Sequence, residues 1–150
     1  MPTETCTIEV NKPIQSVWSF VSDMNNWAPL VPGYIEHEIM NDRESTWKFK
    51  SDVGMFKKKV HLKVDITSWD EPSKVTFTLT GINEKFKGHG YFSARSNNND
   101  KTTMTGALSI TAEGAFGKMV NNILKTSLPE MTNEFTHAVA NEIECKVNSY

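Results

Sequence analysis

Acid–base chemistry in this sequence centres on one histidine. His37 alternates in step with Ile35 and Ile39, so its side chain is predicted to face the interior of the protein. There an imidazole could serve as a general base near neutral pH or donate a hydrogen bond to a ligand carbonyl. The alternative is a core histidine that is satisfied by a backbone group or a water molecule. His61 and His89 have the opposite parity and are expected in solvent.

Other catalytic patterns are missing from the sequence. No Asp or Glu has inward parity on a predicted strand, so there is no pair of carboxylates for acid–base catalysis. A GxSxG elbow, a phosphate-binding loop and an HExxH motif are also absent. Cys6 and Cys145 are the only cysteines and lack CxxC spacing, which argues against a disulfide framework and against a zinc site. We therefore expect no cofactor and no metal.

Composition narrows the class of protein. The chain has 150 residues, enough for one domain, which we predict to span residues 1–150. Its formal net charge is −2 and its only arginines are Arg43 and Arg95, so it is a poor candidate for binding nucleic acid. No apolar run approaches the ~20 residues that cross a bilayer, and the N-terminus has no secretory pattern. We expect a soluble, cytoplasmic protein without a stable membrane anchor.

The first part of the chain predicts one strand and two short helices. Thr5–Val10 alternates as a half-buried strand, and Pro13 opens a helix at its first position. Asp23 is placed to cap a second helix that ends at Trp27. Six alternating segments follow, at residues 35–39, 46–51, 60–67, 75–80, 85–92 and 103–111. Alternation of this kind is typical of an antiparallel sheet with one face in solvent.

A long helix completes the predicted elements. From Gly114 to about Val147, apolar residues recur at helical spacing, and Pro129 inside this segment is predicted to bend the helix. Only this helix is long enough to cover the apolar face of seven strands. We therefore predict an α+β fold in which a seven-stranded curved antiparallel sheet wraps around a long C-terminal helix.

Glycines on the inner face of the sheet suggest a cavity. Gly88, Gly90 and Gly106 all share the apolar parity of their strands. They remove side-chain volume from the interior, and four Trp, eight Phe and seven Met are available to line the space that remains. We expect an apolar cavity between the sheet and the long helix. In the alternative, the glycines only allow the sheet to bend and the helix fills the gap.

Several segments resemble one known superfamily. They are PIQSVW at residues 13–18, DMNNWAPLVPG at residues 23–33 and GAFGKMVNNIL at residues 114–124. Together they are similar to the START-like (SRPBCC, helix-grip) superfamily. The Val53-Gly54 turn and the Gly88/Gly90 strand resemble its CoxG-like group, whose name comes from the carbon monoxide dehydrogenase system. The resemblance implies a helix-grip fold with a hydrophobic cavity for lipids, quinones or polyketide-like molecules.

These observations predict a non-catalytic binding or carrier protein for a small hydrophobic ligand. Such a protein could act as a CoxG-like accessory protein beside a partner enzyme. The residues expected to border the cavity are Trp27, Leu30, Val31, His37, Trp47, Phe49, Leu62, Phe77, Phe86, Gly88, Gly90, Phe92, Met104, Leu108, Met119, Val120, Ile123 and Leu124. Met55 and Phe56 could form a lid over its mouth. Two alternatives are a polyketide cyclase/dehydratase-like enzyme with His37 as general base, and a protein–protein module.

Overall fold

The computed structural model describes residues 3–53, 56–82, 85–98, 100–114 and 117–148. Within these ranges, seven strands form one antiparallel sheet in the order β1-β7-β6-β5-β4-β3-β2. The strands are β1 (Thr3–Val10), β2 (Tyr34–Ile39), β3 (Glu44–Val53), β4 (Phe56–Asp70), β5 (Lys74–Gly81), β6 (Phe86–Asn98) and β7 (Lys101–Ala112). The predicted number and direction of the strands are confirmed.

Two short helices connect β1 to β2. They are α1 (Ile14–Val21) and α2 (Met24–Trp27), and a turn of 3-10 helix, η1 (Ala28–Leu30), follows directly. Asp23 caps α2 as predicted, because its carboxylate accepts a hydrogen bond of 2.9 Å from the backbone N–H of Asn25. Pro13 lies one position earlier than expected. It is the residue before α1, and its carbonyl accepts from the backbone N–H of Ser16 at 2.9 Å.

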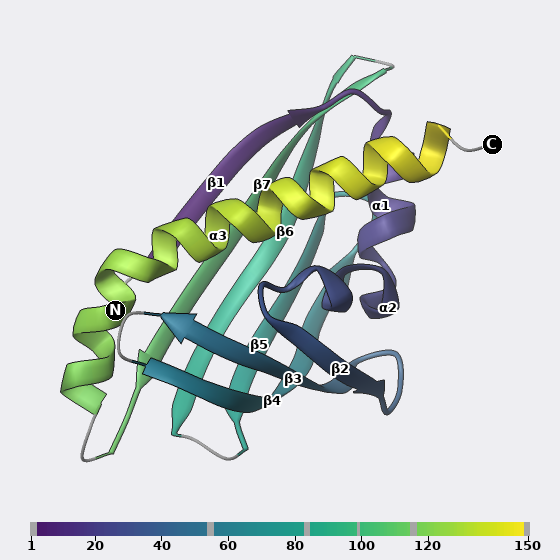
Figure 1. Cartoon of the computed structure of the whole chain (residues 1–150). Helices are drawn as coiled ribbons and strands as arrows, with labels where there is room; N and C mark the ends of the chain where they lie inside the picture. The colour runs from purple at the N-terminus through teal and green to yellow at the C-terminus, as the bar shows by residue number, and fades with distance from the viewer. Residues whose placement is uncertain (1–2, 54–55, 83–84, 99, 115–116, 149–150) are drawn as a thin grey trace.

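The sheet curves around α3 (Gly117–Asn148), which lies along its concave face, while α1 and α2 cover one end (Figure 1). The first turns of α3, at the lower left of the figure, run in a different direction from the rest of the helix. Pro129 lies inside α3 and has no N–H for the helical hydrogen bond, which explains the bend. The predicted helix-grip architecture is therefore confirmed.

A bulge in the edge strand β2 corrects one detail of the predicted alternation. The register of β2 against β3 shifts between Tyr34 and Glu36, so Ile35 is the extra residue. Tyr34 pairs with Phe49 on the inner face, and Ile35 is 44% exposed. The prediction that Ile35 faces inward was wrong, because strict alternation holds only where the ladder is regular.

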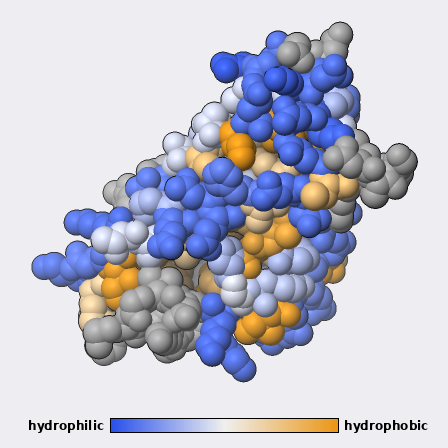
Figure 2. Space-filling view, turned by 45° about the horizontal axis from the view of Figure 1, so that its top comes forward, coloured by the Kyte–Doolittle hydropathy of each residue, from blue (hydrophilic) through white to orange (hydrophobic). Residues whose placement is uncertain are grey.

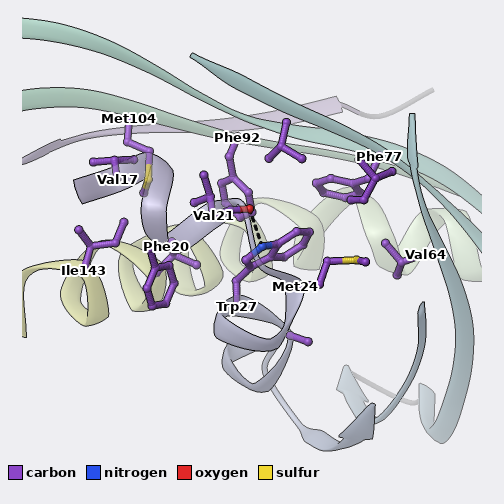
Figure 3. Packing of buried hydrophobic residues seen from close by; sticks show 14 of the residues in the cluster. Val17, Phe20, Val21, Met24, Trp27, Val64, Phe77, Phe92, Met104 and Ile143 are labelled. Carbon is purple, nitrogen blue, oxygen red and sulfur yellow. Dashed lines mark hydrogen bonds between the residues drawn. The ribbon is translucent and has the colours of Figure 1, made fainter. Parts of the chain in front are cut away.

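The centre of the core is Trp27 at the end of α2. Its indole lies between Phe92 and Phe77 of the sheet, and its ring nitrogen donates to the carbonyl of Val21 at 2.9 Å (Figure 3). Trp27 has no exposed surface. Because the polar atom of this large ring is satisfied inside the protein, the ring can fill the core without a desolvation penalty.

None of the three inward glycines faces open space, and a Cβ atom at Gly88 would overlap the backbone carbonyl oxygen of Ser109. A Cβ atom at Gly90 would lie 2.7 Å from the ring of Phe77, and one at Gly106 would overlap the hydroxyl of Thr136 on α3. At these positions the hollow predicted from the sequence is wrong, because a neighbouring side chain already packs against the bare backbone. At Gly106 the alternative prediction is correct, because a side chain of α3 fills the space that the glycine leaves.

Candidate functional site

An apolar pocket lies between the sheet and the first half of α3. Its volume is about 50 Å³. It is at the end of the sheet where β5 and β7 stop and β6 begins. Its lining residues are Phe49, Val60, Leu62, Leu79, Phe86, Ile110, Val120, Ile123, Leu124 and Met131. All ten side chains are apolar, so the pocket can hold an apolar group but offers no side-chain hydrogen bond to it.

Several features position this lining. Alternation on β3 to β7 turns one apolar side chain in every two towards α3. The first half of α3 is held by Asn121, whose side-chain amide accepts from the backbone N–H of Ala112 at 2.8 Å and donates to its carbonyl at 3.1 Å. Gly117 allows a close approach here, since a Cβ atom would lie 2.8 Å from the Ala112 carbonyl oxygen. Val120 and Leu124 form a small apolar cluster with Ala112 that is separate from the main core.

Six of the residues predicted to border a cavity line this pocket, namely Phe49, Leu62, Phe86, Val120, Ile123 and Leu124. Gly88 lies beside it, because its cross-strand partners are Leu79 and Ile110, which both line the pocket. Of the three glycines, only Gly88 is therefore at the cavity. The part of the prediction that places the cavity under the first half of the long helix fits the geometry.

The other predicted residues lie elsewhere. Trp27, Trp47, Phe77 and Phe92 belong to the buried core, as does Met104, and Leu30, Val31 and Leu108 pack against that core. Gly90 lies under the ring of Phe77. None of these residues is in the lining of the apolar pocket.

Met119 is placed differently from the prediction. Its side chain is 57% exposed, whereas the next residue, Val120, is buried. Figure 2 shows several hydrophobic areas on an otherwise mainly hydrophilic face of the molecule. Met119 therefore faces solvent, and its assignment to the cavity was wrong.

His37 is on the inner face but outside the apolar pocket. It pairs with Trp47 across the β2–β3 ladder, which confirms the predicted face. Its Nε2 is 2.8 Å from Asn25 Oδ1, and its Nδ1 is 2.6 Å from the hydroxyl of Tyr34. In a neutral ring, Nε2 would donate to Asn25 Oδ1 and Nδ1 would accept from the Tyr34 hydroxyl. Both ring nitrogens are thus engaged by neighbouring side chains at the edge of the sheet.

A second, larger hollow is polar. It measures about 470 Å³ and is lined by Glu36, His37, Glu38, Met40, Thr46, Lys48 and His61 from β2 to β4. The Lys48 ammonium is 3.1 Å from the Glu36 carboxylate. These are mainly outward-facing side chains, so the hollow is a surface groove. Across the described ranges, no group of His, Cys, Asp or Glu is arranged to hold a metal ion.

Among the residues that the structure describes, the ionisable groups with a shifted pKa do not line the apolar pocket. A hydrogen bond from Lys63, with Nζ 2.7 Å from Oε1, lowers the pKa of Glu44, and the Asn41 amide adds to the effect. The same bond raises the pKa of Lys63. Burial raises the pKa of the Cys6 thiol, opposed by a hydrogen bond to Thr136. Glu44 and Lys63 therefore lie on the outer face, away from the pocket.

The sequence prediction missed four lining residues: Val60, Leu79, Ile110 and Met131. The first three share the inward parity of Leu62, Phe77 and Leu108, which were already assigned to the cavity. Parity alone could have found them, but it could not tell which inward residues lie at the pocket.

The predicted lid of Met55 and Phe56 stays a prediction, because Met55 and the side chain of Phe56 lie outside the described residues. No helix in the described part of the chain is both long and apolar enough to span a membrane.

Comparisons with known proteins agree with this fold. A protein-family model matches residues 1–147, and no curated protein is significantly similar to the sequence. A conserved protein from Geobacillus kaustophilus is 16% identical, with a TM-score of 0.80 over 95% of each chain. The Zhui aromatase/cyclase from Streptomyces sp. R1128 is 15% identical, with a TM-score of 0.76 over 97% of this chain and 95% of the other. A START superfamily protein from Mycobacterium smegmatis is 17% identical, with a TM-score of 0.70 over 95% of this chain and 97% of the other.

The chain thus has the fold of the START-like and polyketide cyclase-like (SRPBCC) proteins, which are its structural neighbours. It belongs to the family whose model covers residues 1–147. At this level of identity the similar structures establish the fold, and the function has to be argued from the pocket.

Proposed function

We propose that this protein binds a small hydrophobic ligand in the apolar pocket between the sheet and α3, and that it carries or presents the ligand without changing it chemically. One observation carries the proposal: all ten side chains that line the pocket are apolar. Such a pocket gains free energy by removing apolar ligand surface from water, at about 25 cal/mol per Å² before the costs of binding. A polar group of the ligand stays outside the lining.

The small volume requires the pocket to adapt. Pockets that bury a whole drug-sized ligand measure roughly 300–1,000 Å³, well above the size of this one. Met131 is the lining residue best suited to move, because its unbranched side chain repacks at little cost. Ile123 is also only half-buried. A ligand is therefore expected to displace these two α3 side chains and occupy more space than the empty pocket has.

The geometry gives less support to catalysis. No lining side chain can accept or donate a proton, and both ring nitrogens of His37 already have hydrogen-bond partners in Tyr34 and Asn25. The similarity to an aromatase/cyclase concerns the fold.

In our proposal the ligand is a lipid, a quinone or a polyketide-like molecule, and the protein works in the cytoplasm. Where a partner enzyme exists, the protein acts beside it as a CoxG-like accessory protein.

Displacement of a lipophilic fluorescent dye tests the proposal. The wild-type protein is titrated with the dye, and a panel of fatty acids, quinones and aromatic polyketides then competes for it. We expect at least one class to displace the dye with a micromolar or lower Kd. Absence of dye binding and of binding by every class would refute the proposal.

Two matched substitutions locate the site. Ile123→Trp places a large ring in the pocket and is expected to weaken binding by at least tenfold. Lys125→Trp adds the same ring on the opposite, exposed side of α3 and is expected to leave the affinity within twofold. His37→Ala should also leave the affinity unchanged. Turnover of a panel member that disappears in His37→Ala would instead favour the enzyme.

A further inference from the structure

A cluster of aromatic side chains lies next to the apolar pocket, beyond its lining residues. On three elements, a pocket residue and a cluster residue lie one structural repeat apart on the same face. Phe49 lines the pocket and Trp47 is in the cluster on β3, while Leu79 and Phe77 stand in the same relation on β5. On α3, Met131 lines the pocket, and Phe135, one turn later, belongs to the cluster. The cluster therefore begins where the pocket ends.

Trp27 is the centre of this aromatic cluster, which we define as Trp27, Trp47, Phe77, Phe92 and Phe135. The centroid of the Trp27 ring lies 5.3 Å from that of Phe92, 5.4 Å from Trp47, 5.5 Å from Phe77 and 6.4 Å from Phe135. Phe92 and Phe135 are in turn 5.6 Å apart. These distances are those of packed rings, so the cluster leaves no passage for a chain between its members.

Hydrogen bonds hold the two indoles of the cluster in place. Trp27 donates to the Val21 carbonyl at 2.9 Å, as Figure 3 shows, and Trp47 donates to the hydroxyl of Ser45 at 2.8 Å. Trp27 and Ser45 have no exposed surface. Turning either indole would leave a buried N–H without an acceptor, which is costly. This end of the pocket is therefore rigid, unlike the adaptable side lined by Ile123 and Met131.

We propose that the aromatic cluster is the closed inner end of the pocket and that it restricts the ligand to a single narrow, unbranched alkyl chain of limited length, to the exclusion of fused rings. This inference rests on the proposed function and adds the ligand class. The chain enters from the end where α3 begins, with its polar group outermost. It extends between α3 and the sheet until it meets the cluster, where further methylenes find no space.

Calorimetric titration with a series of straight-chain alkyl carboxylates tests this limit. Each added methylene is expected to tighten binding about fourfold while it enters the pocket, from the transfer of one CH₂ group out of water. Beyond one length the gain should stop, and this length is the cut-off. A fused tricyclic carboxylate with the same number of carbons should bind at least tenfold more weakly than the chain at the cut-off.

Phe135→Ala opens the cluster and is expected to move the cut-off to longer chains by at least two methylenes. Phe135→Leu is the milder second variant and should move it by at least one. Phe20→Ala is the matched control, because Phe20 is a buried core phenylalanine that neither lines the pocket nor belongs to the cluster. Its cut-off should equal that of the wild type.

Fluorescence gives an independent readout. A bromine atom at the far end of a cut-off-length chain should lie against the cluster and quench tryptophan emission, whereas a bromine beside the carboxylate should not. Three results would each overturn this inference while leaving the proposed function intact. They are an affinity that rises without a cut-off, a cut-off that is unchanged in both Phe135 variants, and tighter binding of the tricyclic carboxylate. If the wild type bound no chain and no ring, the proposed function itself would fail.

Discussion

Gly106→Ala tests whether the inward glycines hold empty space or a packed contact. A Cβ atom at Gly106 would lie 3.2 Å from Thr136 Cγ2 and 3.3 Å from Thr136 Cβ, and it would overlap Thr136 Oγ1. Thr136 is 1% exposed on α3, so it has little room to retreat. The new methyl group must therefore push α3 away from β7 or distort the strand.

The expected size follows from two opposing effects. Alanine is favoured over glycine within a strand by ~0.5–1 kcal/mol, whereas overpacking a core costs ~1–3 kcal/mol. The overpacking dominates, and the free energy of unfolding should fall by ~1–2 kcal/mol. For a chain of this length, 1 kcal/mol corresponds to ~2–4 °C, so Tm should fall by ~2–8 °C. If the position faced a hollow, the same substitution would raise the stability by ~0.5–1 kcal/mol, so the sign decides.

Urea unfolding followed by circular dichroism measures the change, and a double-mutant cycle assigns its cause. Thr136→Ala removes the atoms that the new methyl group meets. The penalty of Gly106→Ala should therefore be at least ~1 kcal/mol smaller in the Thr136→Ala background. Equal or greater stability of Gly106→Ala, or an equal penalty in both backgrounds, would show that our account of this contact is incorrect.

Four further predictions concern other residues. Asn121→Ala removes both hydrogen bonds to Ala112, and hydrogen exchange in residues 117–128 should speed up more than in the rest of α3; a uniform change would contradict the tether. Asp23→Ala removes the cap of α2 and should cost ~1 kcal/mol of unfolding free energy, whereas Asp23→Asn, which keeps the acceptor, should cost less. Cys145 is exposed and Cys6 buried, so a thiol reagent should label Cys145 first. Burial raises the pKa of the Cys6 thiol above its ordinary value of 9.0. The contribution of this thiol to the free energy of unfolding is therefore full below pH 9.0 and is lost as the pH rises through the folded-state pKa. Cys6→Ala should accordingly lose less stability at alkaline pH than the wild type.

The sequence predicted the architecture because period-two alternation and helical spacing are properties of local segments. Asp23, Pro129 and the seven strands were all assigned from neighbours within a few residues. The face of His37 was also correct. Such signals are sufficient to say which way a side chain points, since an antiparallel sheet alternates regularly except at bulges such as the one at Ile35.

The site was predicted less completely because occupancy depends on contacts between distant segments. The absence of a side chain at Gly90 and Gly106 was clear from the sequence, but the arrival of Phe77 and Thr136 in that space was not. Trp27 could have lined a cavity or filled the core, and only its packing against Phe92 distinguishes the two. Met119 was placed inward from the helical spacing that it shares with Val120 and Ile123, and spacing alone does not give the exposure of a residue near the start of a helix.

The pairing of β1 with β7 has a consequence for how the chain reaches its native state. The register sets Val10 opposite Thr102, so the first strand is synthesised long before the strand against which it pairs. Closing so large a loop is entropically costly and slows folding. Until it closes, β7 presents an unpaired edge that another copy of β1 can occupy. Refolding should therefore be slower than in a protein of local contacts, and its yield should fall as protein concentration rises, through exchange of the first strand between molecules.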